Sequence, residues 1–187
     1  WFKKGIQGNC HLQHLTLRQA KEFGVGGYSS FTMDDVLVEQ CGGHGVWACG
    51  TGVVGRCTNM EVRQCGFSGV LASNGASITL IGAKTTVHHN CTHRYSAQYG
   101  LKVSGSSSST IQLVSPLTKE QVATDNGGGG NWGDAGRSHA DWQITTVVGT
   151  VDEEKKDGAR DKTNVAEEEQ ATLKTQSKKS TTKCQMQ

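Results

Sequence analysis

An eleven-residue stretch occurs twice in this chain, and its spacing constrains the fold more than any other sequence feature. Residues 38–48 read VEQCGGHGVWA and residues 62–72 read VRQCGFSGVLA, so seven of the eleven positions match at an offset of 24 residues. A fixed period of this size is typical of repeat architectures, in which each repeat cannot bury its apolar face alone. We therefore expect similar units stacked on one another.

The repeat continues in both directions from this pair. Residues 15–20 precede it, residues 85–90 follow it, and residues 110–114 are the predicted last copy. The anchor residues of the successive copies are Leu17, Val38, Val62, Val87 and about Leu113. Apolar and polar residues alternate around the anchors, as in a strand with one buried face. This column, together with Val46 and Val70, is predicted to lie in the interior.

Each unit of about 24 residues has room for two or three short strands separated by Gly, Asn and Ser, and no room for a helix. Leucine-rich repeats are similar in length, but their L-x-x-L-x-L pattern is absent. The unit that fits is one rung of a parallel β-helix, with each strand paired to its counterpart about 4.8 Å along the axis. The predicted fold class is all-β, a parallel β-helix (solenoid) of about four to five rungs.

The V-x-x-C-G-x-x-G-V-x-A pattern at Val38 and Val62 resembles the rungs of right-handed parallel β-helix repeat proteins of the pectate-lyase-like superfamily. The resemblance covers roughly residues 12–117. That superfamily includes carbohydrate-binding proteins and sugar hydrolases. The resemblance implies a right-handed solenoid. It says little about activity, because the rungs are a scaffold that hosts many functions.

Changes in composition divide the chain into four predicted segments. Residues 1–11 are expected to cap the first rung, and residues 12–117 to form the β-helix repeats. Residues 118–150 contain a glycine-rich loop, and residues 141–148 within them alternate well enough to form a cover strand. Residues 151–187 are charged and lack aromatic residues, which predicts a polar, disordered C-terminal tail.

Charge and hydropathy limit the classes of partner. The net charge of +2 is too small for a nucleic-acid binder that relies on gross electrostatics. No run of 18 apolar residues occurs, so no membrane span is expected. The expected partner is a polysaccharide or glycan surface, or another protein, and the open solenoid ends also invite end-to-end association of copies. The compartment stays open, with an extracellular or surface-associated location slightly favoured.

The cysteines do not predict a metal site, and no cofactor is expected. The seven cysteines are odd in number and lack C-x-x-C spacing. Cys41, Cys65 and Cys91 are expected to stack as small buried residues, with a disulfide between neighbouring rungs as the alternative. Gln40 and Gln64 are expected to form a polar ladder at a turn, which His89 continues in place of binding a metal. 

The first of two candidate functions is a non-catalytic scaffold or adhesion module that presents a flat, repeat-built surface. Its candidate contacts with polysaccharide or protein are Trp47, His44, Arg63, His88 and Tyr95. The Trp47 ring can stack on a sugar ring. Arg18, Glu39, Arg63 and His88 form one outward column, which is expected to hold cross-rung ion pairs, with a glycan-binding groove as the alternative.

The second candidate function is a polysaccharide lyase or glycoside hydrolase, of which this chain could be a fragment. The resemblance implies that such an enzyme carries clustered acids, and hydrolases need paired acids about 5–9.5 Å apart. The candidate catalytic acids are Asp34, Asp35 and Glu39, and no acid occurs between Arg63 and Val114. The scarcity of acids favours the non-catalytic function.

Residues 90–92 read Asn-Cys-Thr, which is an acceptor sequence for N-glycosylation. In a secreted chain Asn90 could carry a glycan. The alternative is that the triplet occurs by chance.

Overall fold

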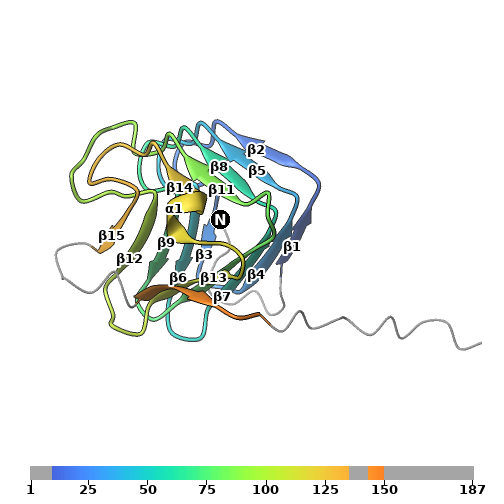
Figure 1. The fold of residues 1–187 in the computed structure, drawn as a ribbon. Coiled ribbons are helices and arrows are strands. Elements are labelled where there is room, and N and C mark those ends of the chain that lie inside the picture. The colour runs from blue at the N-terminus through green and yellow to red at the C-terminus, as the bar shows by residue number, and fades with distance from the viewer. Residues whose placement is uncertain (1–9, 135–142, 150–187) are drawn as a thin grey trace, which may run out of the picture. The chain divides into compact units, whose positions relative to one another are not determined.

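The computed structural model describes residues 10–134 and 143–149 of the chain. These residues form a right-handed parallel β-helix built from three sheets (Figure 1). The first sheet contains β1 (Cys10–Gln13), β4 (Phe31–Asp34), β7 (Val54–Thr58), β10 (Ser77–Ile81), β13 (Thr110–Val114) and β16 (Ile144–Val147). The second contains β2 (Thr16–Arg18), β5 (Leu37–Glu39), β8 (Glu61–Arg63), β11 (Thr86–His88) and β14 (Ala123–Thr124). The third contains β3 (Val25–Gly27), β6 (Val46–Cys49), β9 (Val70–Ser73), β12 (Leu101–Ser104) and β15 (Trp132–Asp134).

The predicted solenoid is confirmed within the described residues. All strand pairs there are parallel, and each strand pairs with its counterparts in the neighbouring rungs. Side chains on the inner faces stack into one continuous core. Val38, Val62 and Val87 are fully buried, as is the predicted pair of Val46 and Val70. The apolar residues of the repeat therefore lie inside the solenoid, as their alternation with polar residues predicts.

The predicted last copy of the repeat, residues 110–114, is assigned to the wrong sheet. Leu17, Val38, Val62 and Val87 do pair in one column, but Ala123 follows them in place of Leu113. Leu113 instead pairs with Leu80 in the first sheet. Both columns alternate apolar and polar residues, so the pattern alone does not separate them. The connections at residues 89–100 and 115–122 are longer than those of the earlier rungs, and this breaks the constant offset of the repeat.

A single residue with left-handed backbone makes the corner after each strand of the second sheet. These residues have φ between 50° and 56°, and they are Gln19, Gln40, Gln64, His89 and Asp125. The Gln40 Nε2–H donates to Gln64 Oε1 at 3.3 Å, which confirms the predicted amide ladder across these two rungs. His89 occupies the same corner, but its Nδ1 lies 2.7 Å from Nδ1 of its neighbour His88.

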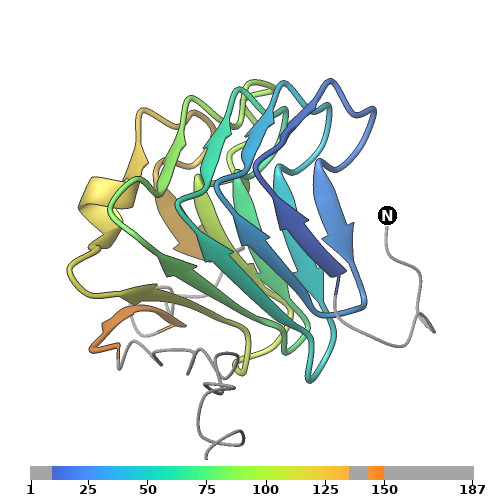
Figure 2. The same cartoon turned by 90° about the vertical axis from the view of Figure 1, so that its right-hand side faces the viewer.

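The last rung is covered by a short helix and a final strand. Helix α1 (Lys119–Val122) begins with a capping box between Thr118 and Gln121, and its Val122 is buried in the core. Figure 2 shows α1 at the end of the solenoid opposite the first rungs. Within the predicted cover strand, β16 pairs with β13. The predicted cap covers residues 1–11, of which Cys10 and His11 belong to β1, so the first rung begins earlier than predicted. The rest of the cap and the predicted tail at 151–187 lie outside the described residues.

Candidate binding surface

Seven aromatic and imidazole rings form a continuous surface over the corner between the second and third sheets and over the outer face of β6. We call this surface the aromatic band, and its members are Tyr28, Trp47, Phe23, His44, Phe67, His93 and Tyr95. Each ring contacts the next, and the band passes from the first rung to the fourth. Rungs about 4.8 Å apart bring rings from distant sequence positions into contact.

Ring contacts in the first half of the band are close and varied in geometry. Tyr28 meets the edge of Trp47 at a centroid distance of 5.5 Å, and Trp47 lies 4.8 Å from Phe23. Phe23 then stacks on His44 at 5.7 Å with an interplanar angle of 5°. A Cβ on Gly26 of β3 would lie 3.3 Å from the Trp47 ring, so the glycine leaves room for that ring against the sheet.

Phe67 connects the second half of the band. Its ring meets His44 at 5.4 Å, His93 at 5.4 Å and Tyr95 at 5.6 Å, all edge to face. Tyr28 and Tyr95, at the two ends, are 43% and 59% exposed, while Trp47 and Phe67 are half-buried. The band is therefore most exposed at its two ends, and the rings between them are held in place by packing.

The corner that carries Tyr95, residues 89–100, is longer than its counterparts and is tied to the third sheet by hydrogen bonds. Ser68 Oγ–H donates to Gln98 Oε1 at 2.9 Å, and the Lys102 Nζ–H donates to the same oxygen at 3.2 Å. The Tyr99 backbone N–H donates to Ser68 Oγ at 3.2 Å. These bonds fix the position of the extended corner, and Tyr95 with it.

The polar groups of Trp47 and His44 are used inside the protein. Trp47 Nε1–H donates to Ser73 Oγ at 2.9 Å, and His44 Nδ1 accepts from the Ser68 backbone N–H at 3.1 Å. Burial lowers the pKa of His44 to about 4, and the nearby Lys102 charge acts in the same direction. His44 is therefore neutral near pH 7 and contributes a ring rather than a charge.

The other two predicted contacts, Arg63 and His88, lie on the outer face of the second sheet and not in the aromatic band. Arg63 binds Glu39 through Nη2 at 2.7 Å and Nε at 2.9 Å, and Nη1 lies 3.2 Å from Glu61. His88 Nε2 lies 3.2 Å from the same Glu61 carboxylate. The predicted cross-rung ion pairing is thus confirmed, and Arg18 completes it at 2.7 Å from Glu39.

The three candidate catalytic acids lie on two sheets and the corner between them. Asp34 ends β4 in the first sheet, Asp35 occupies the following corner, and Glu39 ends β5 in the second sheet. The Glu39 side chain is only 5% exposed, and its hydrogen bond with Arg63 holds the pKa of the carboxyl below its usual value. Asp34 and Asp35 lie 3.8 Å and 3.5 Å from the imidazoles of His11 and His14.

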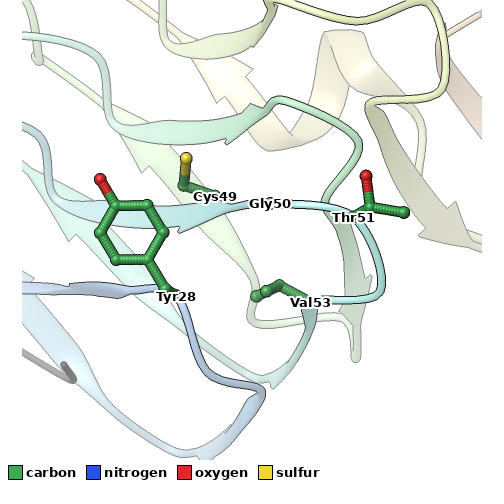
Figure 3. Close-up of a pocket in the computed structure, with 5 residues that line it drawn as sticks. All are labelled: Tyr28, Cys49, Gly50, Thr51 and Val53. Atoms are coloured by element: carbon green, nitrogen blue, oxygen red, sulfur yellow. The ribbon is translucent and has the colours of Figure 1, made fainter. Parts of the chain in front are cut away.

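A pocket of about 300 Å³ lies next to the Tyr28 end of the aromatic band (Figure 3). It is lined by Tyr28, Cys49, Gly50, Thr51 and Val53. In Figure 3 the Val53 side chain points toward the Tyr28 ring, with Cys49 on the neighbouring strand. Residues from the first two rungs therefore build this pocket together.

Sequence reasoning missed Phe23, Tyr28, Phe67 and His93, and also the pocket. Phe23 could have been found, because it follows Gln19 by four residues just as His44 follows Gln40. Phe67 comes three residues after Gln64, so it falls outside that alignment. The contacts of Tyr28 and His93 depend on corner conformations that the repeat does not encode.

Cys41 and Cys65 lie at equivalent positions of neighbouring rungs, as the spacing predicts, whereas Asn90 and not Cys91 takes that position in the next rung. All six cysteines within the described residues are free, and Cys41, Cys65 and Cys91 are buried. A hydrogen bond with Cys41, together with burial, raises the pKa of Cys65, and burial raises the pKa of Cys91 to about 11. In residues 10–134 and 143–149, no group of three or more His, Cys, Asp or Glu side chains is placed to hold a metal ion.

The Asn90 side chain is buried, with 1% of its surface exposed, and is not accessible for glycosylation in the folded protein. Its amide nitrogen donates to the Val62 carbonyl at 3.0 Å. The Asn90 side chain is thus a structural element of the corner, and the folded structure has no room for a glycan there.

None of the helices in the described part of the chain is both long and apolar enough to cross a membrane. Comparisons with models of protein families, with curated proteins and with solved structures found no match to this chain.

Proposed function

We propose that this protein is a non-catalytic β-helix module that binds polysaccharide along the aromatic band. The observation that carries the proposal is the continuity of the band, in which each of seven rings contacts the next across four rungs. Most of the polar atoms of Trp47 and His44 serve internal hydrogen bonds, so what these side chains offer to a ligand is mainly ring surface.

The chemistry of the ligand follows from this surface. A sugar ring has an apolar face of C–H groups that packs on an aromatic ring, and hydroxyl groups at its edge that stay in water or bind polar side chains. A polysaccharide repeats this face along its length, as the solenoid repeats its corners. Binding would then be the sum of several weak stacking contacts spread over a long surface.

The predicted contacts divide into two groups under this proposal. Trp47, His44 and Tyr95 belong to the aromatic band and would contact the polysaccharide directly. Arg63 and His88 are engaged by carboxylates on the second sheet, so they would contribute only to a ligand wide enough to reach that face. Membership of the pectate-lyase-like superfamily is part of the proposal and rests on the residues of the repeat.

The ion pairs around Glu39 favour binding over catalysis. Two guanidinium groups engage its carboxylate, which leaves it poorly placed to accept a proton from a substrate. The experiment below also tests the alternative function, a lyase or hydrolase that uses Asp34, Asp35 and Glu39.

The test measures binding and cleavage in the same samples. The full chain is titrated with a panel of soluble neutral and acidic plant, bacterial and animal polysaccharides by calorimetry, and each mixture is assayed for new reducing or unsaturated ends. We expect binding without cleavage. Tyr95→Ala should weaken binding about 2- to 10-fold, the equivalent of one aromatic contact. Arg56→Ala, on the outer face of the first sheet, is the matched control and should bind normally.

Two results would contradict the proposal. One is cleavage that is lost in Asp34→Asn or Asp35→Asn, which would assign the enzymatic alternative. The other is the absence of binding to every polysaccharide in the panel, which would leave a protein partner as the ligand of the aromatic band.

A further inference from the structure

The pocket beside Tyr28 owes its shape to a corner that differs between neighbouring rungs. Three residues, 28–30, connect the third sheet to the first in the first rung, whereas four residues, 50–53, make this connection in the second. Gly50 and Gly52 of the longer corner have φ of +109° and +79°, which favour glycine. Nothing lies within 4 Å of the position of a Cβ on Gly52, so this residue stands clear, while its neighbour Thr51 lies against Gly75 of the next rung.

The walls of the pocket combine apolar and polar groups. The Tyr28 ring and the Val53 side chain supply the apolar surface, and the Tyr28 hydroxyl group can donate and accept hydrogen bonds, whereas the Thr51 side chain points away from Tyr28 (Figure 3). The thiol of Cys49 is fixed by Asn74, whose Nδ2–H donates to Cys49 Sγ at 3.3 Å. Mostly apolar walls with a few polar groups are typical of small-molecule sites.

The size of the pocket limits what it can hold. Its volume of about 300 Å³ is at the lower end of the range for ligand sites. A single sugar ring suits this space and this lining, because the ring has an apolar face for Tyr28 and Val53 and hydroxyl groups for the polar wall. A continuous stretch of polysaccharide does not suit it.

The pocket is continuous with the aromatic band. Tyr28 lines the pocket and also contacts Trp47 at a centroid distance of 5.5 Å. Trp47 and Cys49 are two residues apart on β6, so both belong to the outer face of that strand. The pocket thus lies at the first-rung end of the band, while Tyr95 lies at the other end.

We infer that this pocket is the end subsite of the aromatic band, which binds the terminal sugar ring of a polysaccharide chain. The inference rests on the proposed function and extends it. A pocket at one end and an open band beyond it would make the protein recognise chain ends in one orientation, with the rest of the chain running over Trp47 toward Tyr95.

The test uses oligosaccharides of defined length and defined ends. Dimers to hexamers of β-1,4-linked glucose, β-1,4-linked xylose and α-1,4-linked galacturonate are each prepared unlabelled, with a bulky fluorophore on the reducing end, and with a bulky group on the non-reducing end. A bulky group on one end of the oligosaccharide should weaken its binding to the full-length protein about tenfold. A bulky group on the other end should have little effect.

Val53→Phe, which fills the pocket, should reduce the affinity for unlabelled oligomers to that of the blocked ones and remove the difference between the two labels. Val54→Phe is the matched control, because Val54 is 48% exposed on the outer face of the first sheet. Tyr28→Leu provides a second variant, at a 43% exposed position, in case Val53→Phe prevents folding. It should also reduce the difference between the labels.

The outcomes separate this inference from the proposed function. Equal binding of both labelled forms, with Val53→Phe equal to Val54→Phe, would overturn the end subsite. The polysaccharide-binding function would then stand as long as Tyr95→Ala still weakens binding. No binding of any oligomer or polysaccharide to the unmodified protein would overturn both.

Discussion

Asn90 accepts a hydrogen bond from the backbone N–H of Cys65 at 3.1 Å, so the side chain of one rung satisfies the main chain of the rung before it. The same side chain donates to the Val62 carbonyl, and both atoms of the amide are used. Gln40 and Gln64 occupy the corner position before the equivalent cysteines, and there the link between rungs runs from side chain to side chain. The fourth rung thus has an amide side chain, Asn90, where the two preceding rungs have Cys41 and Cys65, and this amide bonds to the backbone itself.

Replacing Asn90 with alanine should destabilise the protein by about 2–4 kcal/mol, because it leaves a buried N–H and a buried carbonyl without partners. Urea unfolding measures the change. Thr92→Ala is the control, since it removes the sequon at an exposed residue and should change stability by less than about 0.5 kcal/mol.

When the chain is secreted from eukaryotic cells, glycosidase treatment should not shift its mass. A glycan on Asn90 in the folded protein would contradict the buried position.

Gly45 should not accept a side chain. A Cβ at this position would lie 2.7 Å from the Gly69 carbonyl oxygen and would overlap the Val62 side chain. We expect Gly45→Ala to lose about 2–3 kcal/mol of stability, as overpacked cores do. Gly26→Ala is the comparison, because its Cβ would meet only the Trp47 ring at 3.3 Å and the Phe23 and Trp47 Cβ atoms at 3.4 Å, which need to move by a few tenths of an ångström at most. Thermal melts of the two variants should differ clearly, and equal melts would mean that the rungs can separate to make room.

His44 should make stability depend on pH between about 6.5 and about 4. Burial lowers the pKa of His44 from 6.5 to about 4, so in this range the unfolded chain binds a proton that the folded chain does not. The contribution of His44 is complete above pH 6.5 and is lost as the pH falls toward 4. His44→Gln keeps an acceptor for the Ser68 N–H and should show a shallower loss. Urea unfolding over this range measures both proteins, and parallel curves would exclude the effect.

Glu39 should matter for stability and not for turnover. It is the shared acceptor of Arg18 and Arg63, so Glu39→Gln should lower the melting temperature by a few degrees. The stabilisation depends on the ionised carboxylate, and its pKa is lowered by Arg63, so it is present near pH 7 and lost only as the pH falls through the lowered pKa. Glu120→Gln, at an exposed residue of α1, is the control. Loss of a measured cleavage activity in Glu39→Gln at unchanged stability would point to the enzymatic alternative.

Truncation should separate the end of the solenoid from the residues that follow it. Deleting residues 152–187 should leave a folded protein, because β16 and the strands before it are retained. Deleting from Gly127 onward removes β15 and β16 and leaves the backbone edges of β12 and β13 unpaired, which should promote association. Size-exclusion chromatography and thermal melts compare the two. The same behaviour in both truncations would show that β15 and β16 do not protect the last rung.

The sequence predicted the scaffold well because the repeat has a nearly constant offset. Val38 and Val62 are 24 residues apart in matching surroundings, so the same pattern of apolar residues places both inside. It also predicted that Glu39 and Arg63 would be neighbours, because residues at equivalent positions of adjacent rungs lie side by side. The sheet for residues 110–114 was wrong, because insertions at the corners changed the offset at that point.

The sequence alone thus determined which residues face the core and which face outward in the regular rungs. Only the tertiary structure decided that Asn90 is buried, that Phe23, Trp47 and Phe67 meet in one band, and that Tyr28 and Val53 enclose a pocket. The physical reason is that strands impose a period of two on their side chains, whereas a corner has no fixed period. The direction of a corner side chain depends on its φ and ψ and on the rungs above and below it.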